Sequence, residues 1–86
     1  MTSKTVTVGS SVGLHARPAA QIAQAAADYD KEITLTLPGK PPADASSSLM
    51  IMMLGATHGD TITVASDDPA AVEAITALIG SELDAA

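Results

Sequence analysis

The sequence predicts an α+β fold, an open sandwich in which a small β-sheet carries helices on one face. Segments with alternating polar and apolar residues indicate half-buried strands, and segments with apolar residues three and four positions apart indicate amphipathic helices. The two kinds of segment follow one another in the order β-α-β-β-α-β-α along 86 residues. Because a chain of this length supports one core, we expect a single domain that spans residues 1–86.

The first strand and the first helix are joined by a loop rich in glycine and serine. Residues Thr5–Val8 alternate between polar and apolar side chains, which predicts a strand. A helical pattern begins near Ala16, with Pro18 in the first turn, where its missing N–H group has no cost. His15 is therefore expected at or next to the N-cap of this helix.

The middle of the chain predicts two further strands. Residues Glu32–Leu37 alternate cleanly, and Pro38–Lys40 is a turn signal. Pro41 and Pro42 follow this turn, and proline cannot donate a hydrogen bond to a strand ladder. The next strand is therefore expected to be short or irregular and to lie at an edge of the sheet.

A short apolar helix is predicted over residues Leu49–Leu54. Ser46, Ser47 and Ser48 are all candidates for its N-cap, and Gly55 is expected to end it in the left-handed conformation.

The last part of the chain predicts a strand followed by a helix. His58 lies in the turn before the alternating segment Thr61–Val64 and is expected to be solvated. Asp68 followed by Pro69 predicts the N-cap and first residue of the final helix, so we interpret the Asp67–Asp68 pair as a cap. The apolar stripe of this helix is formed by Val72, Ile75, Leu78, Ile79 and Leu83.

The composition excludes several classes of function. Ten acidic residues against four basic ones give a net charge of −6, which argues against a nucleic-acid partner. The chain has no cysteine, and its two histidines have no cluster of ligands around them, so no metal site and no cofactor are expected. The longest apolar run, Leu49–Leu54, is far shorter than the roughly 20 residues of a membrane span, and the N-terminus has no signal-like segment. We therefore expect a cytoplasmic protein without membrane insertion.

The chemistry of the chain is concentrated at Gly13–Pro18. A helix N-terminus presents N–H groups and a positive dipole end, which together bind anions. A neutral imidazole beside it is a nucleophile for a phosphoryl group, and the amides of Ala16 and Arg17 and the Arg17 guanidinium could bind the phosphoryl oxygens. The alternative is that His15 is a plain cap or a surface residue, and the residues alone leave both interpretations open.

The segment Gly13–Ala19 resembles the active-site motif of the histidine-containing phosphocarrier (HPr) family of the bacterial phosphoenolpyruvate:sugar phosphotransferase system. The segment Ser47–Gly55 is similar to the second signature region of that family, and the length and element order match along the whole chain. The resemblance implies an open-faced sandwich with four antiparallel strands in the order 1-4-2-3, covered on one face by three helices.

The same resemblance implies a function and its residues. His15 would accept a phosphoryl group at Nδ1 from phosphorylated enzyme I and pass it to enzyme IIA components, as a transfer intermediate rather than a stand-alone enzyme. Arg17 would be the electrostatic partner, and the amides of Ala16 and Arg17 would bind phosphate. The partners would dock on exposed apolar side chains of the first two helices, for which we select Leu14, Ala20, Leu49, Met50 and Met53. No sign of an oligomer is present in the sequence, so a monomer is expected.

Several features leave alternatives open. In many relatives a serine at the start of the second helix is a kinase target, which here corresponds to Ser47 and would add a serine kinase or a transcriptional regulator as a partner. Ala45 and Ser46 stand where such relatives often carry a basic residue, and Val12 replaces a polar residue before the glycine. The rival functions are a paralogue in a nitrogen-related or specialised phosphotransfer chain, a regulatory module without phosphotransfer, and an anion-binding interaction domain.

Overall fold

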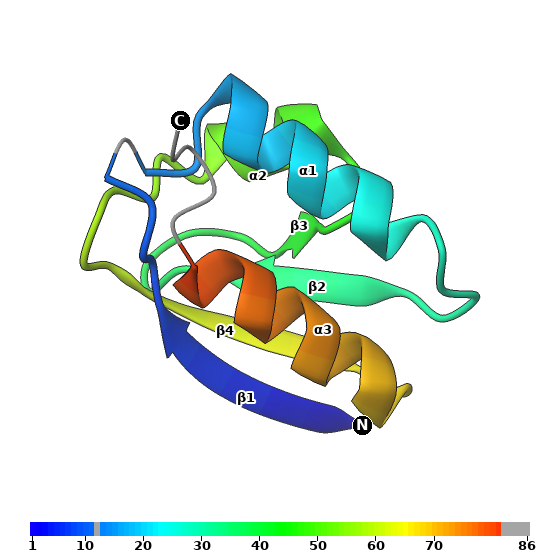
Figure 1. Ribbon diagram of the computed structural model, residues 1–86. Coiled ribbons are helices and arrows are strands. Elements are labelled where there is room, and N and C mark those ends of the chain that lie inside the picture. The colour runs from blue at the N-terminus through cyan, green and yellow to red at the C-terminus, as the bar shows by residue number, and fades with distance from the viewer. Residues whose placement is uncertain (12, 82–86) are drawn as a thin grey trace.

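One sheet of antiparallel strands forms the base of the molecule, and the helices cover one of its faces (Figure 1). The computed structural model describes residues 1–11 and 13–81. The strands are paired in the order β1-β4-β2-β3, which confirms the sheet order implied by the family resemblance. In chain order, the elements are β1 (Thr2–Thr7), α1 (Ala16–Ala26), β2 (Ile33–Thr36), β3 (Ala43–Asp44), α2 (Ser48–Met53), β4 (Thr61–Ser66) and α3 (Pro69–Gly80).

The two inner strands carry the alternation that the sequence predicts. Leu35 of β2 lies opposite Val64 of β4, and both side chains are fully buried under the helices. The threonines between such residues are half-buried on the open face, as in Thr34 and Thr63. This pattern is typical of a sheet with one face on the core and one face toward solvent.

The first strand differs from the prediction at both ends. It runs from Thr2 to Thr7 rather than from Thr5 to Val8, and it pairs with β4 from Thr2 opposite Ser66 to Thr7 opposite Thr61. Five of its six residues are exposed, so the backbone ladder rather than side-chain burial defines its extent. Val8 lies beyond the strand and is fully buried.

The helices are anchored by apolar side chains, and α1 and α3 begin where the sequence predicts, whereas α2 runs from Ser48 to Met53, one residue earlier at both ends than the predicted Leu49–Leu54. Each helix places a fully buried isoleucine in the core: Ile22 from α1, Ile51 from α2 and Ile75 from α3. Asp68 caps α3, with its carboxylate accepting a hydrogen bond from the Ala70 N–H group (Oδ1 to N, 3.0 Å). Leu78 is only half-buried, and Leu83, which we expected in the same stripe, lies outside the described residues.

The edge of the sheet at β3 also matches the prediction. After Pro41 and Pro42 the chain adds a strand of two residues, Ala43–Asp44, which pairs with β2 alone. Within the described part of the chain, no helix has the length and apolar character needed to cross a membrane.

Candidate functional site

The ring of His15 is exposed at the start of α1. The residue occupies the N-cap with an extended backbone (φ −84°, ψ −165°), but its side chain makes no capping hydrogen bond. Its backbone oxygen accepts the first helical hydrogen bond, from the Ala19 N–H group at 2.8 Å. The interpretation of the His15 side chain as a plain cap is therefore wrong, because neither ring nitrogen accepts a hydrogen bond from the N–H groups of the first turn.

The first turn of α1 is suited to hold an anion beside that ring. The N–H groups of Ala16 and Arg17 lie ahead of the first rung of the helical ladder, at the positive end of the helix dipole. Pro18 follows them in the first turn, as predicted, and is buried. The first turn contains no acidic residue, and Arg17 is exposed there in a chain of net charge −6.

A glycine and a buried leucine fix the loop that leads to His15. Gly13 has a left-handed φ of +73°, and a Cβ atom there would lie 2.5 Å from the backbone oxygen of Ala56. That same oxygen accepts a hydrogen bond from the Leu14 N–H group at 3.0 Å. The loop therefore lies against the segment after α2 so closely that only glycine fits.

One docking residue selected from the sequence is placed elsewhere by the fold. Leu14 is 2% exposed and belongs to the hydrophobic core, so its side chain has no surface to offer a partner. The sequence alone could not show this, because an apolar residue next to a reactive histidine fits either a core or an interface. Val12, which replaces a polar residue of the family pattern in this loop, lies outside the described residues.

Three consecutive serines lie at the start of α2, and each has a separate role. Ser47 is the N-cap, and its Oγ accepts a hydrogen bond from the Met50 N–H group at 3.3 Å. Ser46 Oγ instead donates to the Asp44 carboxylate at 2.7 Å, and Ser48 is the first helical residue. The helix ends before Gly55, whose φ of +68° confirms the predicted left-handed position. Of the three candidates, Ser47 is thus the one at the helix cap.

Helix α2 exposes most of its apolar side chains. Leu49 and Met53 are 64% and 71% exposed, whereas Ile51 is fully buried. Met50 is also exposed, and so is Met52, which the sequence analysis did not select because the run is apolar on every face. Ala20 is exposed on α1, which packs beside α2 (Figure 1). We call these exposed apolar side chains of the two adjacent helices (Ala20, Leu49, Met50, Met52 and Met53) the α1–α2 face.

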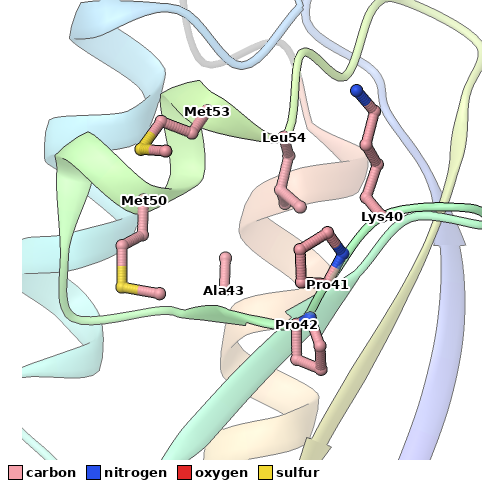
Figure 2. A pocket seen from close by; sticks show the side chains of 7 residues that line it. All are labelled: Lys40, Pro41, Pro42, Ala43, Met50, Met53 and Leu54. Atoms are coloured by element: carbon pink, nitrogen blue, oxygen red, sulfur yellow. The ribbon is translucent and has the colours of Figure 1, made fainter.

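A shallow hollow of about 290 Å³ adjoins this face (Figure 2). Figure 2 shows two methionines of α2 on one side of it and two prolines of the segment before β3 on the other. Its lining is formed by Lys40, Pro41, Pro42, Ala43, Met50, Met53 and Leu54. The hollow therefore extends the apolar surface of α2 toward the edge of the sheet.

The second histidine is not simply a solvated turn residue. His58 is exposed, as expected, but its Nδ1 lies 3.2 Å from the backbone oxygen of Ser10, in the loop that leads to His15. No sequence pattern joins these two positions, which are 48 residues apart. Among the described residues, no group of three or more potential ligands is placed to hold a metal ion.

These features define a class of protein. An exposed histidine at a helix N-terminus that its ring does not cap, on a small open-faced sandwich beside an apolar face, is the arrangement expected of a phosphocarrier, which holds a phosphoryl group between two partners. Residues 2–81 match the family model described as "PTS HPr component phosphorylation site", and the chain belongs to this HPr/NPr family of phosphocarrier proteins.

Individual relatives are similar over nearly the whole chain. The phosphocarrier protein HPr of Haemophilus influenzae is 42% identical over 82 residues, which cover 92% of this chain and 95% of that protein. The phosphocarrier protein NPr of Shewanella violacea is 40% identical over 84 residues, with 94% and 91% covered. The crystal structure of an HPr from Thermoanaerobacter tengcongensis superimposes with a TM-score of 0.89 at 30% identity and covers 100% of this chain and 99% of that one.

Proposed function

We propose that this protein carries phosphoryl groups in a phosphoenolpyruvate-dependent sugar phosphotransferase system, accepting them on His15 from enzyme I and passing them to enzyme IIA components. The observation that carries the proposal is the exposed His15 ring, which lies at the positive end of α1, two residues before Arg17, and makes no capping hydrogen bond to the helix. In this proposal the protein acts in the cytoplasm, as a monomer, between enzyme I and the components that serve sugar uptake.

The transfer step uses the residues at the start of α1. A lone pair of the His15 ring, at Nδ1 by family resemblance, forms a bond to phosphorus while the bond from phosphorus to the enzyme I donor breaks. The Ala16 and Arg17 amides and the Arg17 guanidinium stabilise the charge that spreads over the phosphoryl oxygens in the transition state. In the second transfer a nucleophile of an enzyme IIA component forms a bond to phosphorus while the bond from phosphorus to the His15 nitrogen breaks, which returns His15 to its unphosphorylated form.

The α1–α2 face supplies the docking surface in this proposal. Ala20, Leu49, Met50 and Met53 are exposed beside the helix end that carries His15, and exposed Met52 adds to them. Methionine side chains adapt to differently shaped partners, which suits a carrier that binds a donor and several acceptors in turn. With four basic residues in the chain, apolar contact contributes more to docking than charge does.

Ser47 is the proposed site of regulation by a serine kinase. Its Oγ lies at the N-cap of α2, at the start of the helix whose exposed side chains form most of the α1–α2 face. A phosphoryl group there would add negative charge beside an apolar docking surface and weaken docking on it. Phosphopeptide mass spectrometry of the protein from cells tests this, and the absence of phosphate on Ser46, Ser47 and Ser48 would remove the regulatory proposal.

A nitrogen-related phosphotransfer chain is the second candidate function. It is favoured by the 40% identity to a protein named NPr, beside 42% to one named HPr. Initial rates of phosphoryl uptake from each kind of enzyme I of the same organism separate the two. A higher rate from the sugar-system enzyme supports the first proposal, and the reverse order supports the second.

The first experiment is a phosphotransfer assay with phosphoenolpyruvate, Mg²⁺ and a cognate enzyme I, followed by intact-mass measurement. We expect one added phosphoryl group that is labile in acid and stable in base, and none on the His15→Ala variant. Absence of the adduct with an active enzyme I would leave a regulatory module without phosphotransfer as the better account.

A further inference from the structure

The contact between His58 and Ser10 joins the loop after α2 to the loop before His15. His58 Nδ1 lies 3.2 Å from the Ser10 backbone oxygen, and a carbonyl oxygen only accepts hydrogen bonds, so Nδ1 donates. We infer that His58 is a positioning residue for phosphoryl transfer, fastening the loop that presents the His15 ring. This inference rests on the proposed function of His15.

Backbone hydrogen bonds hold the same two segments together on both sides of this contact. The Val8 N–H group donates to the Asp60 oxygen at 2.8 Å, and the Gly59 N–H group donates to the Val8 oxygen at 3.1 Å. Farther along, the Leu14 N–H group donates to the Ala56 oxygen at 3.0 Å. The stretch between Val8 and Leu14 is thus anchored at its ends, and the His58 ring reaches it in between.

The Ser10 oxygen links His58 to the backbone just before His15. It also accepts a hydrogen bond from the Gly13 N–H group at 3.0 Å, so both of its lone pairs are engaged. Gly13 is buried, has a φ of +73° and stands two residues before His15. Gly13 is held by the Ser10 oxygen, and Leu14 is held by the Ala56 oxygen. A change in the direction of the Ser10 carbonyl would therefore move Gly13 and, through it, the chain that leads into α1.

The turn that carries His58 has its own support. The Thr57 N–H group and Oγ1 both donate to the Asp60 carboxylate, at 2.9 and 3.1 Å. The ring therefore connects two turns that are already formed, and little chain entropy is lost when its hydrogen bond closes.

The side chain of Ser10 provides a matched control. Ser10 is fully buried, and its Oγ has no hydrogen-bond partner among the described residues. The contact uses the backbone oxygen, which any residue would supply. Ser10→Ala removes the hydroxyl and should therefore leave the contact intact.

Three substitutions of His58 distinguish positioning from simple packing. The side-chain nitrogen of asparagine is bonded to Cγ, as Nδ1 is in histidine, whereas the nitrogen of glutamine lies one bond farther from the backbone. We expect kcat for phosphoryl uptake from enzyme I to fall about 5- to 10-fold in His58→Ala and His58→Gln, with KM for enzyme I unchanged. His58→Asn and Ser10→Ala should stay within about twofold of the wild type.

Amide hydrogen exchange of Gly13 and Leu14, measured by NMR, follows the same contact without any phosphoryl transfer. Exchange should be about 5- to 10-fold faster in His58→Ala and His58→Gln and near wild type in His58→Asn. Wild-type rates and exchange in His58→Ala, or equal losses in all three His58 variants, would overturn the inference. If the unmodified protein takes up no phosphoryl group, the proposed function fails, and the order of exchange rates still decides whether His58 holds the loop.

Discussion

The N-termini of α1 and α3 show two ways to begin a helix. At α3, the Asp68 carboxylate accepts a hydrogen bond from the Ala70 N–H group at 3.0 Å, so the chain completes its own helix end. At α1, the residue in the same position is His15, whose ring makes no capping hydrogen bond and is exposed. The difference teaches that α1, unlike α3, does not complete its N-terminus with the side chain of its own N-cap residue, which is the arrangement that the proposed phosphate site requires.

The missing cap is offset by packing. Among the helices in residues 13–81, α2 is capped by Ser47 and α3 by Asp68, whereas α1 lacks a side-chain cap. An N-cap stabilises a helix by about 0.5–2 kcal/mol, so α1 gives up stability of that order. Burial of Ala19 and Ile22 against the core holds α1 in place without it.

The largest expected effect, a complete loss of phosphoryl uptake, comes from giving α1 the cap that α3 has. His15→Asp should raise the free energy of unfolding by about 0.5–2 kcal/mol, because a carboxylate caps the first turn. It should also abolish phosphoryl uptake from enzyme I, since the nucleophilic ring is gone. Urea denaturation and intact mass measure the two effects. His15→Ala is the control, which should lose uptake without gaining stability, and a destabilised His15→Asp variant would contradict the comparison.

The loop before α1 can be broken at Gly13. In Gly13→Ala, left-handed strain and the approach of Cβ to the Ala56 oxygen should together lower the free energy of unfolding by about 2–5 kcal/mol. Gly39→Ala is the matched control, because Gly39 has a φ of +84° but no atom within 4 Å of its ideal Cβ. There the loss should be about 1–2 kcal/mol, from strain alone. Equal losses in urea denaturation would show that the close packing of this loop contributes nothing.

The docking side of α1 can be separated from its chemistry with two alanines. Ala20 lies exposed on the α1–α2 face, and Ala77 lies exposed on α3. Ala20→Asp should lower kcat/KM for uptake from enzyme I about tenfold, because a buried charge at an interface opposes docking. Ala77→Asp should leave it within about twofold. The same loss in both variants would show that docking depends on the overall charge of the protein and not on the α1–α2 face.

The smallest expected effect on phosphoryl uptake lies at α3. Asp68→Ala should lower the free energy of unfolding by about 0.5–2 kcal/mol, because the Ala70 N–H group loses its acceptor. Phosphoryl uptake at saturating enzyme I should stay unchanged, since this cap has no role in transfer. A drop in uptake at a temperature where the variant is folded would mean that the two helix ends are not independent.

The sequence predicted the parts of the fold that local patterns determine. The element order, the start of α1 at Ala16 and the Asp68 cap follow from periodicity and capping chemistry, and the structure confirms them. The extent of β1 was wrong, because an edge strand paired through its backbone needs no apolar alternation.

The candidate site was predictable where neighbours in sequence cooperate, and less so where distant segments meet. His15 and Arg17 stand out in the sequence, and the exposure of Leu49 and Met53 fits the predicted face. The burial of Leu14 depends on packing in the core. The contact between His58 and Ser10 spans 48 residues, which no local pattern can reveal.

The most direct test of the account follows the backbone amides of both helix ends by NMR while enzyme I phosphorylates the protein. We expect one phosphoryl group on His15, with large shifts of the Ala16 and Arg17 N–H signals as they bind its oxygens, and no shift of the Ala70 signal at the capped end of α3. A phosphoryl group on another residue, or a modified His15 with unmoved Ala16 and Arg17 signals, would contradict the claim that the uncapped end of α1 is the phosphate-binding site.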